Sequence, residues 1–90
     1  MTAADKSPVR EDLAGYRVTL AGLRRDCRFY HGCAEAWQIK ATAATCTGDE
    51  ATAEMAQAFA QVCHEESKEL YEQHSLVLNI IRTLEKELTK

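Results

Sequence analysis

The sequence is poor in the residues that interrupt helices. It has one proline, Pro8, and only four glycines in 90 residues. It also lacks any run of about 18 apolar residues, which excludes a transmembrane helix. The polar start, MTAADKSPVRED, contains no apolar segment of a cleaved secretory signal, so we predict a cytoplasmic protein. What remains is a chain with 46% hydrophobic and 28% charged residues, typical of one small helical domain.

The charge is divided unevenly along the chain. Residues 1–46 carry seven Lys/Arg against five Asp/Glu, a net charge of +2, whereas residues 47–90 carry four against nine, a net charge of −5. The opposite signs favour pairing between the two halves. Because no basic excess is available for phosphates, we expect no nucleic-acid partner.

The four cysteines, Cys27, Cys33, Cys46 and Cys63, form no C-x-x-C motif. In a cytoplasmic protein such thiols stay reduced and behave as small apolar residues. A bridge between Cys33 and Cys63 remains an alternative. It requires Cα atoms closer than about 7 Å, whereas packed helix axes lie about 8–10 Å apart.

The few interruptions divide the chain into two long helices. Ser7 as the N-cap and Pro8 at the first helical position are typical of a helix start, and Thr47 with Glu50 has the spacing of a capping box for a second helix. We predict a single all-α domain over residues 1–90, with helices at about 8–45 and 50–88 joined by a turn at about 46–49. Folded back at this turn, the chain is an antiparallel two-helix hairpin.

Each predicted helix carries an apolar 3-4 repeat of the coiled-coil type. In an antiparallel hairpin the facing residues have numbers that sum to 97, so Leu13 faces Leu84 and Trp37 faces Ala60. The second helix has a wider apolar face, which leaves open a seam rotated toward that side. The repeats are Val9, Leu13, Tyr16, Leu20, Leu23, Cys27, Tyr30, Ala34, Trp37, Ala41 and Ala44, then Ala53, Ala56, Ala60, Cys63, Ser67, Leu70, His74, Val77, Ile81, Leu84 and Leu88; the wider face adds Met55, Phe59, Val62, Leu76 and Ile80.

A second 3-4 stripe lies outside the seam of the first helix. It includes three glycines, each of which costs a helix interior about 1 kcal/mol relative to alanine. Close approach of another helix would compensate, so we predict an interface here. A short hairpin gains stability by association, and we expect a homodimeric four-helix bundle or pairing with another helical protein. The predicted interface residues are Gly15, Val18, Gly22, Phe29, Gly32, Ala36, Ile39 and Ala43.

Polar residues interrupt the apolar pattern in two ways. Arg10, Arg17, Arg24 and His31 recur every seven residues beside the first seam, which predicts pairing of Arg24 and Arg28 with Glu69–Glu72 and of His31 with Glu66. Tyr30, Glu66, Ser67, Gln73 and His74 interrupt the core pattern, and we interpret them as a buried polar layer that selects one register.

Candidates for chemistry are few. Cys27 and His31 share a side of one helix, and Cys63 and Glu66 lie on the other, so a small metal-binding bundle is an alternative function. The Glu-x-x-His motif of di-iron bundles is absent, because the corresponding positions read Gln61-x-x-His64 and Tyr71-x-x-His74. No nucleophile with an adjacent base and no phosphate loop is recognisable. We therefore predict a non-enzymatic protein with no cofactor.

These observations favour an interaction or adaptor module that self-associates or pairs with a helical protein. In size and shape the chain also resembles the roughly hundred-residue Trp-x-Gly secretion proteins, which implies a leaderless secreted partner hairpin as a further alternative. Its turn, TCTGDE, lacks their Trp-x-Gly motif.

Overall fold

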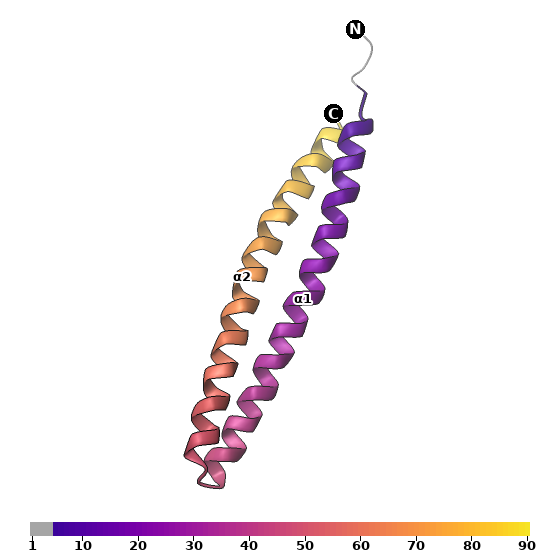
Figure 1. Ribbon diagram of the computed structural model, residues 1–90. Helices are drawn as coiled ribbons and strands as arrows, with labels where there is room; N and C mark the ends of the chain where they lie inside the picture. Colours follow the sequence, from indigo (N-terminus) through magenta and orange to yellow (C-terminus); the bar gives the residue numbers. More distant parts are fainter. Residues whose placement is uncertain (1–4) are drawn as a thin grey trace.

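The computed structural model describes residues 5–90 as two helices packed against each other. Helix α1 spans Ser7–Cys46 and α2 spans Glu50–Leu88. They run antiparallel, so the start of α1 and the end of α2 lie at one end of the rod and the turn lies at the other (Figure 1). The hairpin measures 75 × 14 × 14 Å. The predicted helical hairpin is confirmed, and within residues 5–90 neither helix is long and apolar enough to cross a membrane.

The turn is built from a helix end that requires glycine. The N–H of Gly48 donates to the carbonyl of Thr45, and the N–H of Asp49 donates to the carbonyl of Ala44. This arrangement places Gly48 at a φ of +78°, a conformation that costs glycine little and other residues more. The chain therefore reverses direction at Gly48 without strain.

The predicted caps at both helix starts are wrong by one or two positions. Ser7 is the first residue of α1 rather than its cap, and its N–H donates to Asp5 Oδ1 at 3.0 Å. Thr47 ends α1 instead of beginning α2. Asp49 caps α2, because its carboxylate accepts from both the N–H and the hydroxyl of Thr52, at 3.1 and 2.6 Å. An Asp next to the turn glycine satisfies these donors directly, whereas Thr47 is already held by α1.

The seam between the helices is the predicted one. All nine buried residues belong to the two predicted repeats, and no polar side chain of the described residues is buried. Leu13, Leu20 and Ile81 form the largest buried cluster, toward the open end of the hairpin. Near the turn the core is made of alanines, namely Ala34, Ala41, Ala44, Ala53, Ala56 and Ala60.

The observed register is close to the predicted one. Arg24 and His74 are hydrogen-bonded, with numbers that sum to 98, and Cys27 contacts Ser67, with a sum of 94, against the predicted 97. The alternative seam, rotated toward the wider face of α2, is excluded. The residues of that face, such as Val62 and Leu76, remain exposed in the chain.

Candidate interaction surfaces

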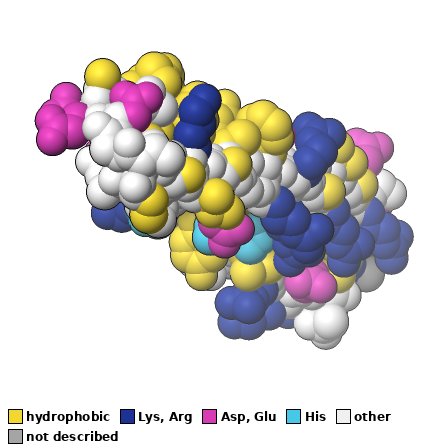
Figure 2. All heavy atoms as spheres, turned by 90° about the horizontal axis from the view of Figure 1, so that it is seen from below, with side chains coloured by type: hydrophobic (Ala, Val, Ile, Leu, Met, Phe, Trp, Pro, Cys, Tyr) yellow, Lys and Arg dark blue, Asp and Glu magenta, His cyan; other side chains and the backbone are white. Residues whose placement is uncertain are grey.

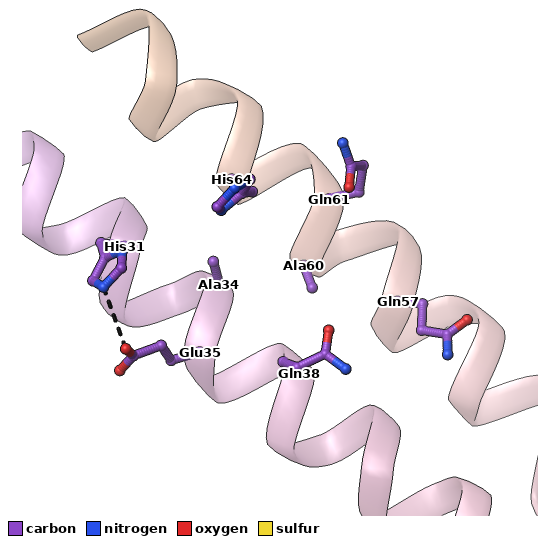
Figure 3. Close-up of a pocket in the computed structure, with 8 residues that line it drawn as sticks. All are labelled: His31, Ala34, Glu35, Gln38, Gln57, Ala60, Gln61 and His64. Atoms are coloured by element: carbon purple, nitrogen blue, oxygen red, sulfur yellow. Dashed lines mark ion pairs between the residues drawn. The ribbon is translucent and has the colours of Figure 1, made fainter. Parts of the chain in front are cut away.

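The two long sides of the hairpin differ in polarity. On one side a groove of about 500 Å³ is lined by His31, Glu35 and Gln38 from α1 and by Gln57, Gln61 and His64 from α2 (Figure 3). Further along the same side, Arg17 lies 3.6 Å from Glu85, and Arg24 Nε donates to His74 Nε2 at 3.0 Å. We call this the polar side.

The opposite long side is apolar. Successive residues in an α-helix are about 100° apart, so residues separated by two positions lie on opposite sides. Phe29 and Phe59 are two positions from His31 and Gln57, which line the polar groove. The apolar side comprises Gly15, Gly22, Phe29, Ala36 and Ala43 on α1 and Met55, Phe59, Val62, Leu76 and Ile80 on α2, interrupted near the middle of α2 by Glu66 and Glu69.

Aromatic contacts hold part of this apolar side in place. The ring of Trp37 stacks on Phe59 with centroids 4.8 Å apart, and Lys40 Nζ lies 5.1 Å from the centroid of Trp37. Phe29 meets the ring of Tyr30 edge to face at 5.3 Å. These contacts leave Phe29 63% and Phe59 46% exposed. The rings are therefore oriented but not covered.

The exposed apolar surface extends over much of the hairpin. Val62 is 62% and Leu76 65% exposed, and seen from the turn end hydrophobic side chains form a band along the upper edge of the molecule, interrupted by basic side chains (Figure 2). Isolated exposed leucines are ordinary, but several large hydrophobic residues gathered on one side of a helix pair mark an interaction surface.

The structure divides the predicted interface residues into two groups. Gly15, Gly22, Phe29, Ala36 and Ala43 lie on the apolar side beside the large residues of α2. Val18, Gly32 and Ile39 lie on the back of α1, pointing away from α2; Val18 is 75% and Ile39 71% exposed. The single stripe expected from the sequence therefore wraps from one side of the hairpin to its back.

The three glycines inside α1 leave room for a side chain in the part of the chain that the structure describes. A Cβ atom added at Gly15, Gly22 or Gly32 would meet nothing within 4 Å. No packing inside the hairpin therefore compensates for their cost to helix stability.

The predicted polar layer is not buried within the chain. Gln73 is exposed, and Tyr30, Glu66, Ser67 and His74 are half-buried. Ser67 contacts Cys27, with Sγ 3.6 Å from Oγ, and His74 accepts a hydrogen bond from Arg24. Ser67 and His74 therefore make separate cross-helix contacts at the seam's edge, and no buried layer forms.

The predicted charge ladder is found only in part. Arg17 lies 3.6 Å from Glu85 of α2, but Arg24 contacts His74 rather than Glu69–Glu72, and Arg28 forms no ion pair among residues 5–90. His31 Nε2 lies 3.2 Å from Glu35 on its own helix rather than near Glu66. The physical reason is the side of α2 on which each acid lies. Glu66 is two positions from His64 and therefore faces the apolar side, away from His31.

The alternative metal site is not assembled either. Cys27 points toward Ser67, His31 pairs with Glu35, and Glu66 faces the other long side. Across residues 5–90 no three His, Cys, Asp or Glu side chains come together in an arrangement that could hold a metal ion. The four cysteines are free thiols, with Cys46 exposed and the others half-buried.

Sequence reasoning missed the polar groove. Gln57, His64 and Tyr71 recur every seven residues on α2, opposite the His31 side of α1. This spacing predicts a polar edge on α2 that faces Arg10, Arg17, Arg24 and His31 of α1. It is the sequence pattern from which the groove could have been predicted.

Comparison with known proteins gives no relative from which a role could be transferred. No protein-family model matches the chain, and neither a curated protein nor a solved structure shows significant similarity to it.

Proposed function

We propose that this protein is a non-enzymatic interaction module that self-associates through its apolar side into a four-helix bundle. The observation that carries the proposal is a group of large hydrophobic side chains that nothing in residues 5–90 covers. Pairing two hairpins through this side gives each helix a second apolar neighbour, as in other four-helix bundles. We place the protein in the cytoplasm, where its free thiols stay reduced.

The energy available from this surface is of the size that association requires. Six large side chains lie on it, and between 39% and 65% of each is exposed. Complete burial of such a side chain stabilises by about 1.5–3 kcal/mol, so covering the exposed half gives about 1 kcal/mol each and about 12 kcal/mol for two copies. Association costs about 4–15 kcal/mol. We therefore expect a dimer whose population depends on protein concentration.

The test compares two substitutions on α2 with similar exposure. Leu76 is 65% exposed on the apolar side, and Tyr71 is 62% exposed on the polar side. We expect Leu76→Asp to weaken self-association at least tenfold in sedimentation equilibrium, because burying an unpaired carboxylate is costly. Tyr71→Asp should leave the association constant within about twofold of the parent chain, because Tyr71 lies on the polar side, outside the proposed contact. The tenfold effect expected at Leu76 corresponds to about 1.4 kcal/mol.

Circular dichroism establishes that both variants remain helical. A parent chain that stays monomeric at all concentrations while fully helical would overturn self-association. Equal weakening by both substitutions would show that the apolar side is not the contact.

A further inference from the structure

The two helices carry blocks of opposite charge at the same level of the hairpin. Residues 24–28 of α1 contain three arginines and one aspartate, a net charge of +2. Residues 65–72 of α2 contain four glutamates and one lysine, a net charge of −3. The contacts Arg24–His74 and Cys27–Ser67 place the two blocks side by side within the hairpin. Arg24 and Arg28 lie on the polar side, whereas Glu66 and Glu69 of the acidic block face the apolar side.

Two symmetric dimers can be built on the apolar side. If the two-fold axis runs along the rod, both turns lie at the same end, and each α1 packs on the partner's α2. If the axis is perpendicular to the rod and parallel to the interface, the turns lie at opposite ends. Each α1 then packs on the partner's α1 and each α2 on the partner's α2. The two arrangements use the same surface but different helix pairs.

The acidic block of α2 distinguishes these arrangements. With the turns at opposite ends, the acidic middle of α2 meets the acidic middle of the partner's α2. Glu66 and Glu69 of both copies then crowd around the axis, and like charges facing each other across an interface are unfavourable. With the turns at the same end, Glu66 and Glu69 of each copy lie against the partner's α1 instead, so the four glutamates are divided between two separate places rather than gathered at the axis.

The sizes of the side chains favour the same arrangement. On the apolar side α1 offers mostly small residues, and α2 offers mostly large ones. An α1–α2 contact between copies sets large residues against small ones, which allows close packing. An α2–α2 contact sets large against large, and an α1–α1 contact sets small against small except at Phe29. The small residues are Gly15, Gly22, Ala36 and Ala43, and the large ones are Met55, Phe59, Val62, Leu76 and Ile80.

We infer that the second copy docks with both turns at the same end, the α1 helix of each chain lying antiparallel to the partner subunit's α2. This inference rests on the proposed self-association and specifies its geometry. It has a consequence for an adaptor role: both pairs of chain ends emerge at one end of the bundle, and the other end carries two turns.

The native Cys46 beside the turn provides the test. It is exposed, and a variant with Cys27, Cys33 and Cys63 changed to alanine retains it as the single site for a nitroxide spin label. Pulsed electron–electron double resonance then measures the distance between the two labels in the dimer, at a concentration where sedimentation shows that dimers predominate. Circular dichroism verifies that the variant is as helical as the parent chain.

The expected label-to-label distance is below about 35 Å, because neighbouring helices in a bundle lie about 8–10 Å apart. Turns at opposite ends would separate the labels by about 60 Å, the length of a 40-residue helix. As a control, a label at Lys68→Cys in the background without native cysteines lies near the middle of the rod and gives a short distance in both arrangements.

Each outcome has a separate meaning. A short distance from Cys46 with a short control distance supports the inference. A distance near 60 Å from Cys46 with a short control distance overturns the same-end arrangement and leaves self-association intact. A monomeric mass with no dipolar signal from either label overturns the proposed self-association itself.

Discussion

Gly22 and Gly32 provide a matched pair of sites for testing whether the apolar side is covered. Both lie inside α1, and a Cβ at either would meet nothing within 4 Å in the hairpin. In an isolated hairpin, alanine at each position should therefore raise the free energy of unfolding by about 1 kcal/mol, the difference in helix propensity. Gly22 lies on the apolar side, whereas Gly32 lies on the back of α1.

Self-association makes the two substitutions differ. We expect Gly32→Ala to stabilise by about 1 kcal/mol at every protein concentration, which corresponds to a rise in melting temperature of about 4–8 °C. Gly22→Ala should gain clearly less, or lose stability, at concentrations where the dimer forms, because its methyl group meets the partner helix. Urea unfolding followed by circular dichroism at a low and a high protein concentration measures both effects.

Two results would refute this reasoning. Equal stabilisation by both substitutions at all concentrations would show that Gly22 faces water in the functional state. A loss of stability in Gly32→Ala would show that the back of α1 is also packed against another molecule, so that the interface is larger than the apolar side.

Three further predictions concern the hairpin itself. Leu20→Ala should lower the free energy of unfolding by about 2–5 kcal/mol in urea titrations, because Leu20 is 7% exposed in the main cluster, whereas Val18→Ala, at a site 75% exposed, should change it by less than about 0.5 kcal/mol; similar losses at both sites would contradict the described seam. Hydrogen bonds from the hydroxyl and then the N–H of Thr52 hold the pKa of Asp49 below its ordinary 3.8, so the stability that ionised Asp49 contributes is present above pH 3.8 and is lost as the pH falls through the lower folded pKa. Asp49→Asn keeps a cap acceptor that does not titrate, so its free energy of unfolding should fall less on acidification. An identical pH profile for the variant and the parent chain would count against this cap. Cys46 should react with a thiol reagent faster than the other three cysteines in the native chain, since it alone is exposed, and uniform rates would argue against the half-buried positions of the others.

The two helices, their approximate lengths and the seam followed from the sequence alone. A long stretch without proline, an apolar 3-4 repeat and one Gly-Asp turn leave little choice but two antiparallel helices. The repeats also contain every residue that is buried within residues 5–90, from Leu13 to Ile81. These features are local or periodic, and a helix converts a period directly into a face.

The sides of the hairpin could not be assigned as reliably. The sequence predicted His31 near Glu66 and a buried layer including Gln73, but these residues flank the seam rather than occupy it. Whether a flanking residue meets its counterpart depends on which long side of the paired helices it faces. The apolar repeat alone identifies the residues of the seam. To predict which flanking residues meet across it, the register between the helices and the residues on both sides of each seam must be considered together.

The caps show the same division at a smaller scale. Thr47 and Asp49 are both suitable cap residues, and the spacing to Glu50 favoured Thr47. The hydrogen bonds of the turn decided otherwise, because Gly48 at positive φ ends α1 with Thr47 and leaves Asp49 facing the first free N–H groups of α2.

What the sequence by itself determined is the hairpin, because helix periodicity and the absence of interrupting residues are properties of consecutive residues. The tertiary structure decided that one long side is polar, with Arg17 and Arg24 making polar contacts to α2, while Phe29, Phe59 and Leu76 are exposed on the other. That separation arises only when two helices are fixed side by side, since each flank then acquires a neighbour from the other helix and the pair gains two distinct sides.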